Sequence, residues 1–395
     1  MTERTRLNKE WLDYLAAASR EFERSRIRSS RYYPHYTEQG AWKLLDVGAL
    51  SSWQDGTYEH GNWTAGFWFG NMWLTAMVQG DDKPAELALS RLAELTDRAH
   101  DHTTHDLGFL FYPSIALGYQ CGYLGLEQIE PALQAARMTA RRFNDQGRYI
   151  QAFGPVGEVR SAGTSTIDTL MNLPLLWWAY GVTEDPRLLD VARHHARTSA
   201  RLLVRPDGST IHLMQLDPVS GAFLTESTLQ GASPDSAWSR GSGWAVGGLS
   251  WSYAMTREPE LLVAAERAAA YYERMTTPDK LPPWDFSDDS PAAPPDASAA
   301  AAVALGYLLL GVSHPDSTAR SRFDTAGRGL LDTVTRLAVN RDEGADGILL
   351  HSCYSVPRGR GVDGATAWGD FYYGLAMSVA HGALPIEYLL TSRRR

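Results

Sequence analysis

The sequence of 395 residues predicts an all-α fold, a single-domain (α/α)6 barrel, from two features of its helical segments. Stretches almost free of charge, rich in Gly, Ala and aromatic residues, alternate along the chain with strongly charged amphipathic stretches. About six of each kind occur, counting an amphipathic helix at the N-terminus. A ring of inner helices, buried on all sides, inside a ring of outer helices with one polar face would produce this alternation.

The charge-poor stretches are the predicted inner helices, because a helix surrounded by other helices needs small or apolar side chains all round. In chain order they span 64–80, 112–125, 160–180, 239–255, 296–312 and 365–382. The first carries no charged residue at all, and the fifth opens with Asp296 as a candidate N-cap.

The charged stretches are the predicted outer helices, each with an apolar stripe on an otherwise polar surface. They span 7–26, 81–101, 126–143, 185–203, 258–275 and 315–338. An open helical solenoid would also alternate, but its repeats share a sequence pattern that these helices lack. Residues 1–63 comprise the N-terminal helix and an irregular Tyr- and Trp-rich segment, and we expect one domain over residues 1–395.

The composition excludes several classes of protein. A net charge of −9 provides no basic surface for nucleic acid. No apolar run approaches the roughly 18 residues of a membrane span, and the N-terminus lacks the apolar core of a signal peptide. Cys121 and Cys353, far apart in the chain, suggest neither a disulfide framework nor a thiolate metal site. We therefore expect a cytoplasmic protein with no nucleic-acid or membrane partner.

Asp168 is the only acidic residue in the third charge-poor stretch, and we place it in the first turn of a buried helix. A lone carboxylate in such a place must cap the helix, be paired or do chemistry. The cap is a serious alternative, because residues 165–168 have the Ser-x-x-Asp spacing of a capping box.

Polar and aromatic residues gather where the predicted inner helices begin. They are Asn62, Trp63, His105, Asp106, Asp168, Gln230, Trp238, Arg240, Trp244, Trp284, Asp285, Trp368 and Asp370. If the inner helices run parallel, these residues meet at one end of the barrel, where helix N-termini attract anions. Trp faces stack on sugar rings, and the Arg240 guanidinium can clamp a carboxylate with two N–H groups. Together these features predict a site for an acidic saccharide.

Each candidate also has a purely structural interpretation. His105 can be a loop histidine bonded to the backbone, Asp106 can cap a turn, and Arg240 can form an ion pair on a helix surface. The sequence has no Gly-rich phosphate loop, no G-x-S-x-G segment and no H-E-x-x-H segment. We expect neither a cofactor nor a metal ion.

Six ordered motifs resemble the unsaturated glucuronyl hydrolases of glycoside hydrolase family 88. They are WTAGFWFGNMWL, THDLGFLFYPS, STIDTLMNLPLLWWA, WSRGSGW, PPWDF with PPDASAAA, and AWGDFYY, and they extend from about Asn62 to Tyr373. The resemblance implies the same (α/α)6 barrel, and it implies that Asp106 and Asp168 are the catalytic pair.

The resemblance also implies a set of substrate contacts. These are Trp63, His105, Phe153, His212, Gln230, Trp238, Arg240 and Trp244, with Ser355, Arg358 and Arg360 in the loop 351–364. Ala65 stands where relatives often carry an acid or amide, and Phe153 where they carry Trp, so the leaving sugar can differ. Arg360 replaces a Lys of some relatives and Arg358 a Ser, which predicts recognition of an anionic group on that sugar. The alternative is that both arginines only solubilise the loop.

Members of this family act on the 4-deoxy-4,5-unsaturated uronic acid that a polysaccharide lyase leaves at a non-reducing end. The enol ether is protonated at C4, water adds at C5, and the hemiketal opens to release the shortened sugar. The resemblance thus implies one carboxyl that gives a proton to carbon and takes one from water, and Asp168 is the candidate. A helix N-terminus would lower its pKa, whereas burial and Asp106 would raise it, and the second effect must prevail at neutral pH.

Three other functions stay open. An unsaturated rhamnogalacturonyl hydrolase would use the same chemistry. A sugar epimerase on the same barrel would depend on His105 and His212, and a non-catalytic saccharide-binding protein would need the Trp cluster without both acids. The expected partner is an unsaturated uronic-acid oligosaccharide, and the expected state is a monomer or homodimer.

Overall fold

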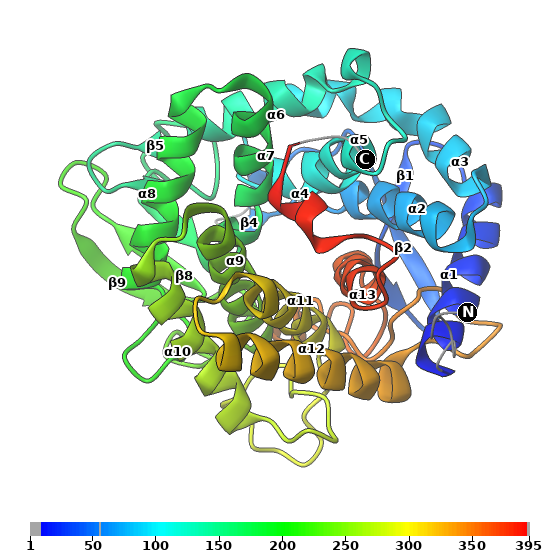
Figure 1. The fold of residues 1–395 in the computed structure, drawn as a ribbon. Helices are drawn as coiled ribbons and strands as arrows, with labels where there is room; N and C mark the ends of the chain where they lie inside the picture. Colours follow the sequence, from blue (N-terminus) through cyan, green and yellow to red (C-terminus); the bar gives the residue numbers. More distant parts are fainter. Residues whose placement is uncertain (1–8, 55–56, 393–395) are drawn as a thin grey trace.

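The structure, a computed structural model, describes residues 9–54 and 57–392, and over these residues the chain forms two concentric rings of helices (Figure 1). The inner ring consists of α2 (Ala65–Gln79), α4 (Leu107–Phe111) with η2 (Tyr112–Ala116) and α5 (Leu117–Gln120), α7 (Leu173–Thr183), α9 (Ser239–Thr256), α11 (Ala297–Ser313) and α13 (Ala367–Ala380). The outer ring consists of α1 (Lys9–Ile27), α3 (Lys83–Arg91) with η1 (Leu92–His100), α6 (Glu130–Arg141), α8 (Pro186–Leu202), α10 (Pro259–Met275) and α12 (Ser317–Ala338). The predicted (α/α)6 barrel is confirmed.

Both rings close on themselves. The last inner helix, α13, packs against the first, α2, and the first outer helix, α1, packs against the last, α12. An open solenoid would leave its terminal helices without such contacts, so the closure excludes that alternative.

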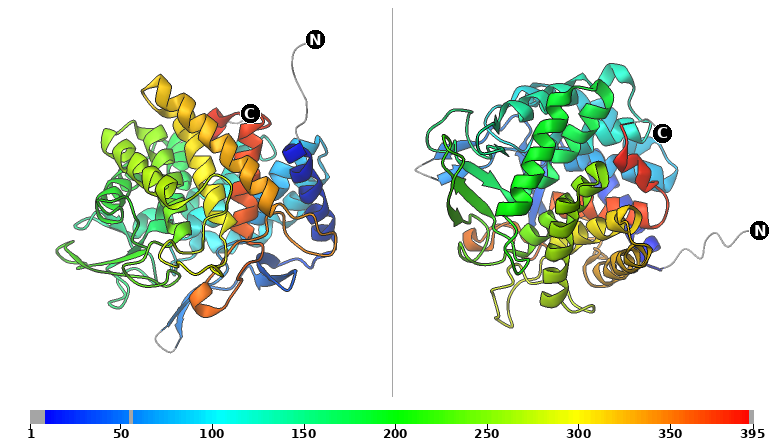
Figure 2. Two further views of the ribbon diagram at one scale, coloured as in Figure 1. Left: turned by 90° about the horizontal axis from the view of Figure 1, so that it is seen from below. Right: turned by 60° about the vertical axis from the view of Figure 1, so that its left-hand side comes forward.

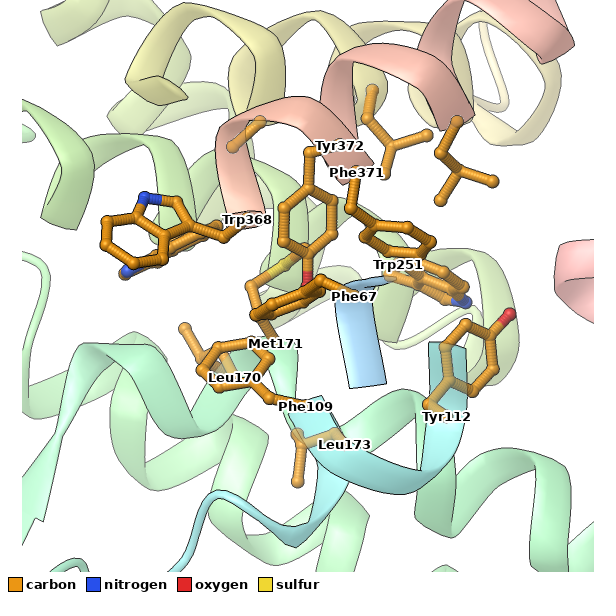
Figure 3. Close-up of a cluster of buried hydrophobic side chains, with 14 of the residues drawn as sticks. Phe67, Phe109, Tyr112, Leu170, Met171, Leu173, Trp251, Trp368, Phe371 and Tyr372 are labelled. Atoms are coloured by element: carbon orange, nitrogen blue, oxygen red, sulfur yellow. The ribbon is translucent and has the colours of Figure 1, made fainter. Parts of the chain in front are cut away.

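The centre of the barrel is filled by aromatic side chains from several inner helices (Figure 3). The ring of Phe67 on α2 lies 5.3 Å from that of Phe109 on α4 and 5.4 Å from that of Phe371 on α13, between centroids. Burying one such side chain contributes about 1.5–3 kcal/mol. Burying an unpaired charged side chain here would be unfavourable, because it would lose its hydration. The inner helices are therefore poor in charged residues.

The second inner helix begins earlier than the sequence predicts. We expected it at Tyr112, where the charge-poor stretch 112–125 begins. The structure starts α4 at Leu107 and accommodates Pro113 in the π-helical turn η2. A π-turn relieves the clash and the missing N–H of an internal proline, so the helix continues through it.

The segment before the barrel is not irregular, contrary to the sequence prediction. It holds two antiparallel hairpins, formed by β1 (Tyr32–Glu38) with β2 (Ala41–Asp46) and by β3 (Ser52–Gln54) with β4 (Thr57–Glu59). The first turns at Gln39 and Gly40, whose φ angles of 51° and 77° match the hairpin turn that favours Gly. Of the predicted N-terminal helix 7–26, residues 7–8 lie outside the described part of the chain.

Hairpins and long loops gather at one end of the barrel (Figure 2). Besides the two N-terminal hairpins there are β5 (Phe143–Asn144) with β6 (Tyr149–Ile150), and an antiparallel sheet in the order β7 (Thr164–Thr166), β8 (Leu213–Leu216), β9 (Phe223–Ser227). Short helical segments are η3 (Leu126–Gln128), η4 (Ile167–Met171), η5 (Val356–Arg358) and η6 (Ile386–Leu390). No described helix is long and apolar enough to cross a membrane.

Gly108 marks a close contact between two inner-helix starts. A Cβ at this position would lie 2.4 Å from the Cα of Asn172, a backbone atom that cannot move aside. We expect Gly108→Ala to reduce the free energy of unfolding by about 1–3 kcal/mol, the usual cost of overpacking. Urea denaturation followed by circular dichroism measures the change.

The matched control is Gly329→Ala in the interior of α12, where an added Cβ meets nothing within 4 Å. There the loss of backbone freedom in the unfolded chain should stabilise the protein by about 0.4–1 kcal/mol. Similar effects at both positions would contradict the close packing of α4 on Asn172.

Candidate active site

One cavity opens at the barrel end where the inner helices begin. Its walls are His60, Trp63, His105, Asp106, Phe109, Phe153, Thr166, Asp168, His212, Leu229 and Gln230. These residues come from loops and helix starts spread over 170 positions of the sequence, between 60 and 230. Most of the residues predicted to act on or bind a ligand therefore meet in one place.

The starts of the other inner helices also reach this end of the barrel. Trp63, just before α2, stacks on Trp368 in the first turn of α13, with 4.9 Å between ring centroids. Arg240, in the first turn of α9, lies 5.0 Å from the Trp368 ring and pairs with Asp296, the N-cap of α11. The inner helices therefore run parallel, as the position of the polar residues predicted.

Asp106 is held in the cavity wall by side chains rather than by a helix cap. Although it occupies the N-cap position of α4, it makes no side-chain cap hydrogen bond. Its carboxylate accepts hydrogen bonds from Asn172 Nδ2 at 3.3 Å and from Thr104 Oγ1 at 3.2 Å. Burial raises the pKa of Asp106 above its usual value, against the opposing effect of these contacts and of His60. The capping alternative for Asp106 is excluded.

Asp168 lies in the 3-10 segment η4, and α7 begins only at Leu173, so the acid precedes the helix in which we placed it. The Ser165 hydroxyl and Asp168 Oδ2 both lack a hydrogen-bond partner among the described residues, so no capping box forms. While Oδ2 is buried, the side chain as a whole keeps 18% of its surface exposed, toward the cavity. The carboxyl is thus free to meet a ligand.

The environment of Asp168 raises its pKa to about 7, chiefly through burial and next through the negative charge of Asp106. Arg240 and the indole N–H of Trp244 act in the opposite direction but are weaker. Near neutral pH the carboxyl is therefore divided between its protonated and ionised forms, as acid and base chemistry on one group requires.

His212 is presented to Asp168 by the β7–β8 pairing. The Ile167 N–H, next to Asp168, donates to the His212 carbonyl oxygen at 3.0 Å, which brings the two side chains together. His212 Nδ1 lies 2.9 Å from the Thr228 hydroxyl and accepts from the Leu229 N–H at 3.3 Å. A nitrogen that accepts carries no proton, so this contact assigns the ring proton to Nε2, 3.7 Å from Asp168 Oδ2. Burial, and then Arg240, lower the pKa of His212 to about 3, so it is a neutral donor.

His105 is a buried neutral histidine as well. Burial lowers its pKa to about 3, and its Nδ1 lies 2.8 Å from the Thr169 hydroxyl. Its Nε2 lies 3.4 Å from Asp106 Oδ1. It is therefore not bonded to backbone as a loop histidine, but fixed between the two segments that carry the acids.

Arg240 is neither a surface residue nor part of the cavity wall. Its guanidinium is buried between the rings of Trp238 and Trp368, at 4.4 and 5.0 Å. One terminal nitrogen donates to Asp296 and to the Cys353 carbonyl, and the other donates to Gln230 Oε1 and to the Tyr354 carbonyl. The structure thus shows Arg240 orienting Gln230, and a direct clamp on a ligand carboxylate stays a prediction.

The other aromatic and acidic candidates support the wall from behind. Trp238 packs on His212 at 4.5 Å between ring centroids, and Trp244 packs on Phe109 at 5.8 Å. Asp285 accepts hydrogen bonds from the Ala232 N–H and the Ser236 hydroxyl and so fixes the loop after Gln230. Asp370 accepts the backbone N–H groups of Ile348 and Leu349, and Trp284 Nε1 donates to Asp288. These contacts are structural, and binding of a ligand by Trp238 and Trp244 stays a prediction.

A second, smaller cavity adjoins the first and shares three wall residues with it. Its walls are His60, Leu229, Gln230, Tyr354, Ser355 and Arg358. Arg360 lies outside the wall, and both Arg358 and Arg360 pair with Glu59 at 3.4 and 3.1 Å. Ser355 and Arg358 thus lie at the same end of the barrel as the two acids, as the sequence predicted.

Sequence reasoning missed His60 and Glu59, which follow each other at the end of β4. The His60 ring meets Tyr58 and Phe153 edge to face at 5.0 and 5.8 Å and borders both cavities. Burial lowers the pKa of His60 to about 4. An alternating apolar pattern would have revealed the hairpin, but nothing local indicates that its end faces the site. Three other wall residues were missed because nothing local in the sequence indicates that they face the site. They are Phe109, Thr166 and Leu229.

No group of three or more His, Cys, Asp or Glu side chains in the described part of the chain is placed to hold a metal ion. The wall instead offers two carboxyls, neutral imidazoles, the Gln230 amide and the Thr166 hydroxyl, which suit proton transfer and hydrogen bonding to a sugar.

Comparisons with known proteins bear on this site. No family model matches the sequence. The chain is 34% identical over 322 residues to an unsaturated glucuronyl hydrolase of Bacillus sp. (strain GL1), across 79% of this chain and 84% of that one. It is 34% identical over 320 residues to an unsaturated chondroitin disaccharide hydrolase of Streptococcus pyogenes serotype M1, across 79% of each.

Solved structures agree with these relatives. The crystal structure of the unsaturated glucuronyl hydrolase from Bacillus sp. GL1 superposes with a TM-score of 0.83 at 31% identity, over 94% of this chain and 96% of that one. That of an unsaturated glucuronyl hydrolase specific for heparin superposes with a TM-score of 0.84 at 27% identity, over 94% and 97%.

The raised pKa of Asp168 predicts a pH-dependent stability. The pKa of about 7 in the folded protein lies above the usual 3.8, so the folded state is favoured while the carboxyl is protonated. That advantage is full below about pH 4 and is lost as the pH rises through 7. Asp168→Asn cannot ionise and should exceed the wild type in stability at pH 8 by up to about 4 kcal/mol, and by less at pH 5.

Thermal unfolding midpoints of both proteins at pH 5 and pH 8 measure this difference. A difference between the variant and the wild type that stays the same at both pH values would mean that Asp168 ionises as an ordinary exposed acid.

Proposed function

The chain belongs to the family of unsaturated glucuronyl hydrolases, which are glycoside hydrolases, and we propose that Asp168 is the acid and base of its reaction. The observation that carries this proposal is the Asp168 carboxyl itself, facing the cavity with its pKa raised to about 7. The substrate is an oligosaccharide with a 4,5-unsaturated uronic acid at its non-reducing end, and the reaction hydrates the C4=C5 bond.

In the first step, protonated Asp168 gives its proton to C4. The π electrons of the C4=C5 bond form the new C–H bond, and the positive charge at C5 is shared with the ring oxygen. A carboxyl that stays partly protonated near neutral pH is needed here, because an ordinary Asp would be ionised. Burial of Asp168 and the nearby Asp106 maintain that proton.

In the second step, the Asp168 carboxylate takes a proton from water as the water oxygen bonds to C5. The product is a hemiketal. Its C5–O5 bond breaks to leave a ketone at C5, and the hemiacetal thereby formed at C1 releases the leaving sugar with its glycosidic oxygen. Asp168 ends protonated, as it began, so the chemistry needs no other acid or base.

The remaining wall residues hold the unsaturated sugar. We assign the flat faces of Trp63 and Phe153 to its ring, and the Nε2–H of His212 and the amide of Gln230 to its polar groups. Arg240 takes up the Oε1 of Gln230 and thereby leaves the amide NH₂ group to donate to the ligand. Asp106, fixed by Asn172, supplies the negative charge that tunes Asp168.

The relatives do not support the other functions considered for the sequence. The relatives described above are named for glucuronyl or chondroitin disaccharide substrates. None of them is named for a rhamnogalacturonyl substrate. An epimerase would need a basic histidine, but burial lowers the pKa of both His105 and His212 to about 3. Both acids line the cavity, whereas a binding protein would not need them. The monomeric or dimeric state and the cytoplasmic location stay predictions.

The test of this function is hydrolysis of unsaturated disaccharides made by several polysaccharide lyases, followed by loss of ultraviolet absorbance from the conjugated double bond. We expect Asp168→Asn to lose about 10²–10⁴ in kcat, because an amide can neither give nor take the proton. Asp145→Asn, at an exposed ion pair on the outer surface, is the control and should keep full activity. Retention of more than about a tenth of the turnover by Asp168→Asn would exclude the assigned role.

Arg358 and Arg360 are proposed to recognise a sulfate or carboxylate on the leaving sugar. Arg358 lines the smaller cavity, and Arg360 pairs with the same Glu59 outside its wall. The two side chains keep 22% and 45% of their surface exposed. At that exposure each contact is worth about 1 kcal/mol. Replacing both by Ala should raise KM roughly 10- to 30-fold for sulfated disaccharides. Steady-state kinetics should show little change for uncharged ones, and equal KM changes for both classes would refute the assignment.

A further inference from the structure

The two arginines beside the smaller cavity are already bridged by one carboxylate of the protein. Glu59 Oε1 lies 3.4 Å from Arg358 Nη1, and Glu59 Oε2 lies 3.1 Å from Arg360 Nη1. Each carboxylate oxygen thus accepts from a different guanidinium. An anion on a ligand would meet these arginines in the same way, so Glu59 occupies the place of such an anion.

The hairpin that carries Glu59 is anchored to the segment that carries Asp106. Tyr58, the preceding residue, donates its hydroxyl to the Thr103 carbonyl oxygen at 2.7 Å, three positions before Asp106. Tyr58 also packs on Phe153 with 4.4 Å between ring centroids. Glu59 therefore cannot leave the arginines by a movement of its backbone without disturbing the wall of the larger cavity.

The smaller cavity has a second polar group that is prepared for a ligand. The Ser355 side chain is 2% exposed, and its hydroxyl has no hydrogen-bond partner among the described residues. A buried hydroxyl without a partner costs free energy that a ligand group can recover. The Ser355 hydroxyl and the Arg358 guanidinium therefore lie on residues that line the same cavity.

Arg358, Arg360 and Glu59 together carry a net charge of +1. A neutral sugar substituent meets only a mild field. A sulfate must share the guanidinium donors with Glu59 and bring a negative charge close to its carboxylate, which is unfavourable.

We propose that Glu59 is a specificity-determining residue that weakens binding of leaving sugars with an anionic substituent relative to neutral ones. This inference rests on the proposed function, because it assigns the smaller cavity to the leaving sugar. Arg358 and Arg360 attract the anion, and Glu59 limits how much of that attraction a ligand receives.

The experiment compares Glu59→Gln with the wild type on two probes, an unsaturated uronic acid linked to N-acetylgalactosamine with and without a 6-sulfate. Turnover is measured in the active proteins, and binding is measured by calorimetry in the Asp168→Asn background. Glu158→Gln is the matched control, since it removes one carboxylate that contacts Trp53 of the same hairpin and Ser161 but no arginine.

We expect Glu59→Gln to raise the affinity for the sulfated probe roughly three- to tenfold relative to the neutral one, and Glu158→Gln to leave the ratio unchanged. The gain should shrink at 0.5 M salt, where charges are screened. An unchanged ratio in Glu59→Gln, or an equal change in both variants, would overturn the inference. Absence of turnover by the wild type would instead refute the proposed function, and the binding ratio would still decide the role of Glu59.

Discussion

The active site depends on the burial of two carboxyls at the wall of one cavity. Burial raises the pKa of both Asp106 and Asp168, and the charge of the first raises the pKa of the second further, to about 7. Without that effect Asp168 would be an ionised carboxylate at neutral pH and would have no proton for carbon. The neutral histidines fit the same picture, since burial also removes their charge.

The barrel makes this arrangement possible because one set of residues stabilises the fold and another set, at the starts of the inner helices, forms the site. Aromatic packing on the barrel axis and closed rings of helices hold the starts of the inner helices together. The β7–β8 pairing then sets Asp168 against His212, and Asn172 joins α4 to the start of α7 through Phe109 and Asp106. The stability of the large core offsets the unfavourable free energy of burying two acids.

The sequence predicts the helical part of the fold, because charge-poor stretches rich in small residues become buried inner helices and charged stretches become outer helices. It also predicts that Asp106 and Asp168 meet, because parallel inner helices bring their starts to one end. The start of α4 was missed because it precedes the charge-poor stretch at Tyr112. The N-terminal hairpins were missed because their strands, such as Ser52–Gln54 and Thr57–Glu59, are too short for their alternation to stand out. The pairing of Glu59 with Arg358 joins residues 299 positions apart, and no local pattern reports such a contact.

The most direct measurement of the central claim is the ionisation of the Asp168 carboxyl itself, followed by carbon-13 NMR of labelled aspartate. The signal is assigned by its absence in Asp168→Asn, and the titration is repeated in Asp106→Asn. We predict a pKa near 7 in the wild type and a lower pKa in Asp106→Asn, because the neighbouring negative charge is gone. A pKa near 4 in the wild type, or the same pKa in both proteins, would contradict the account.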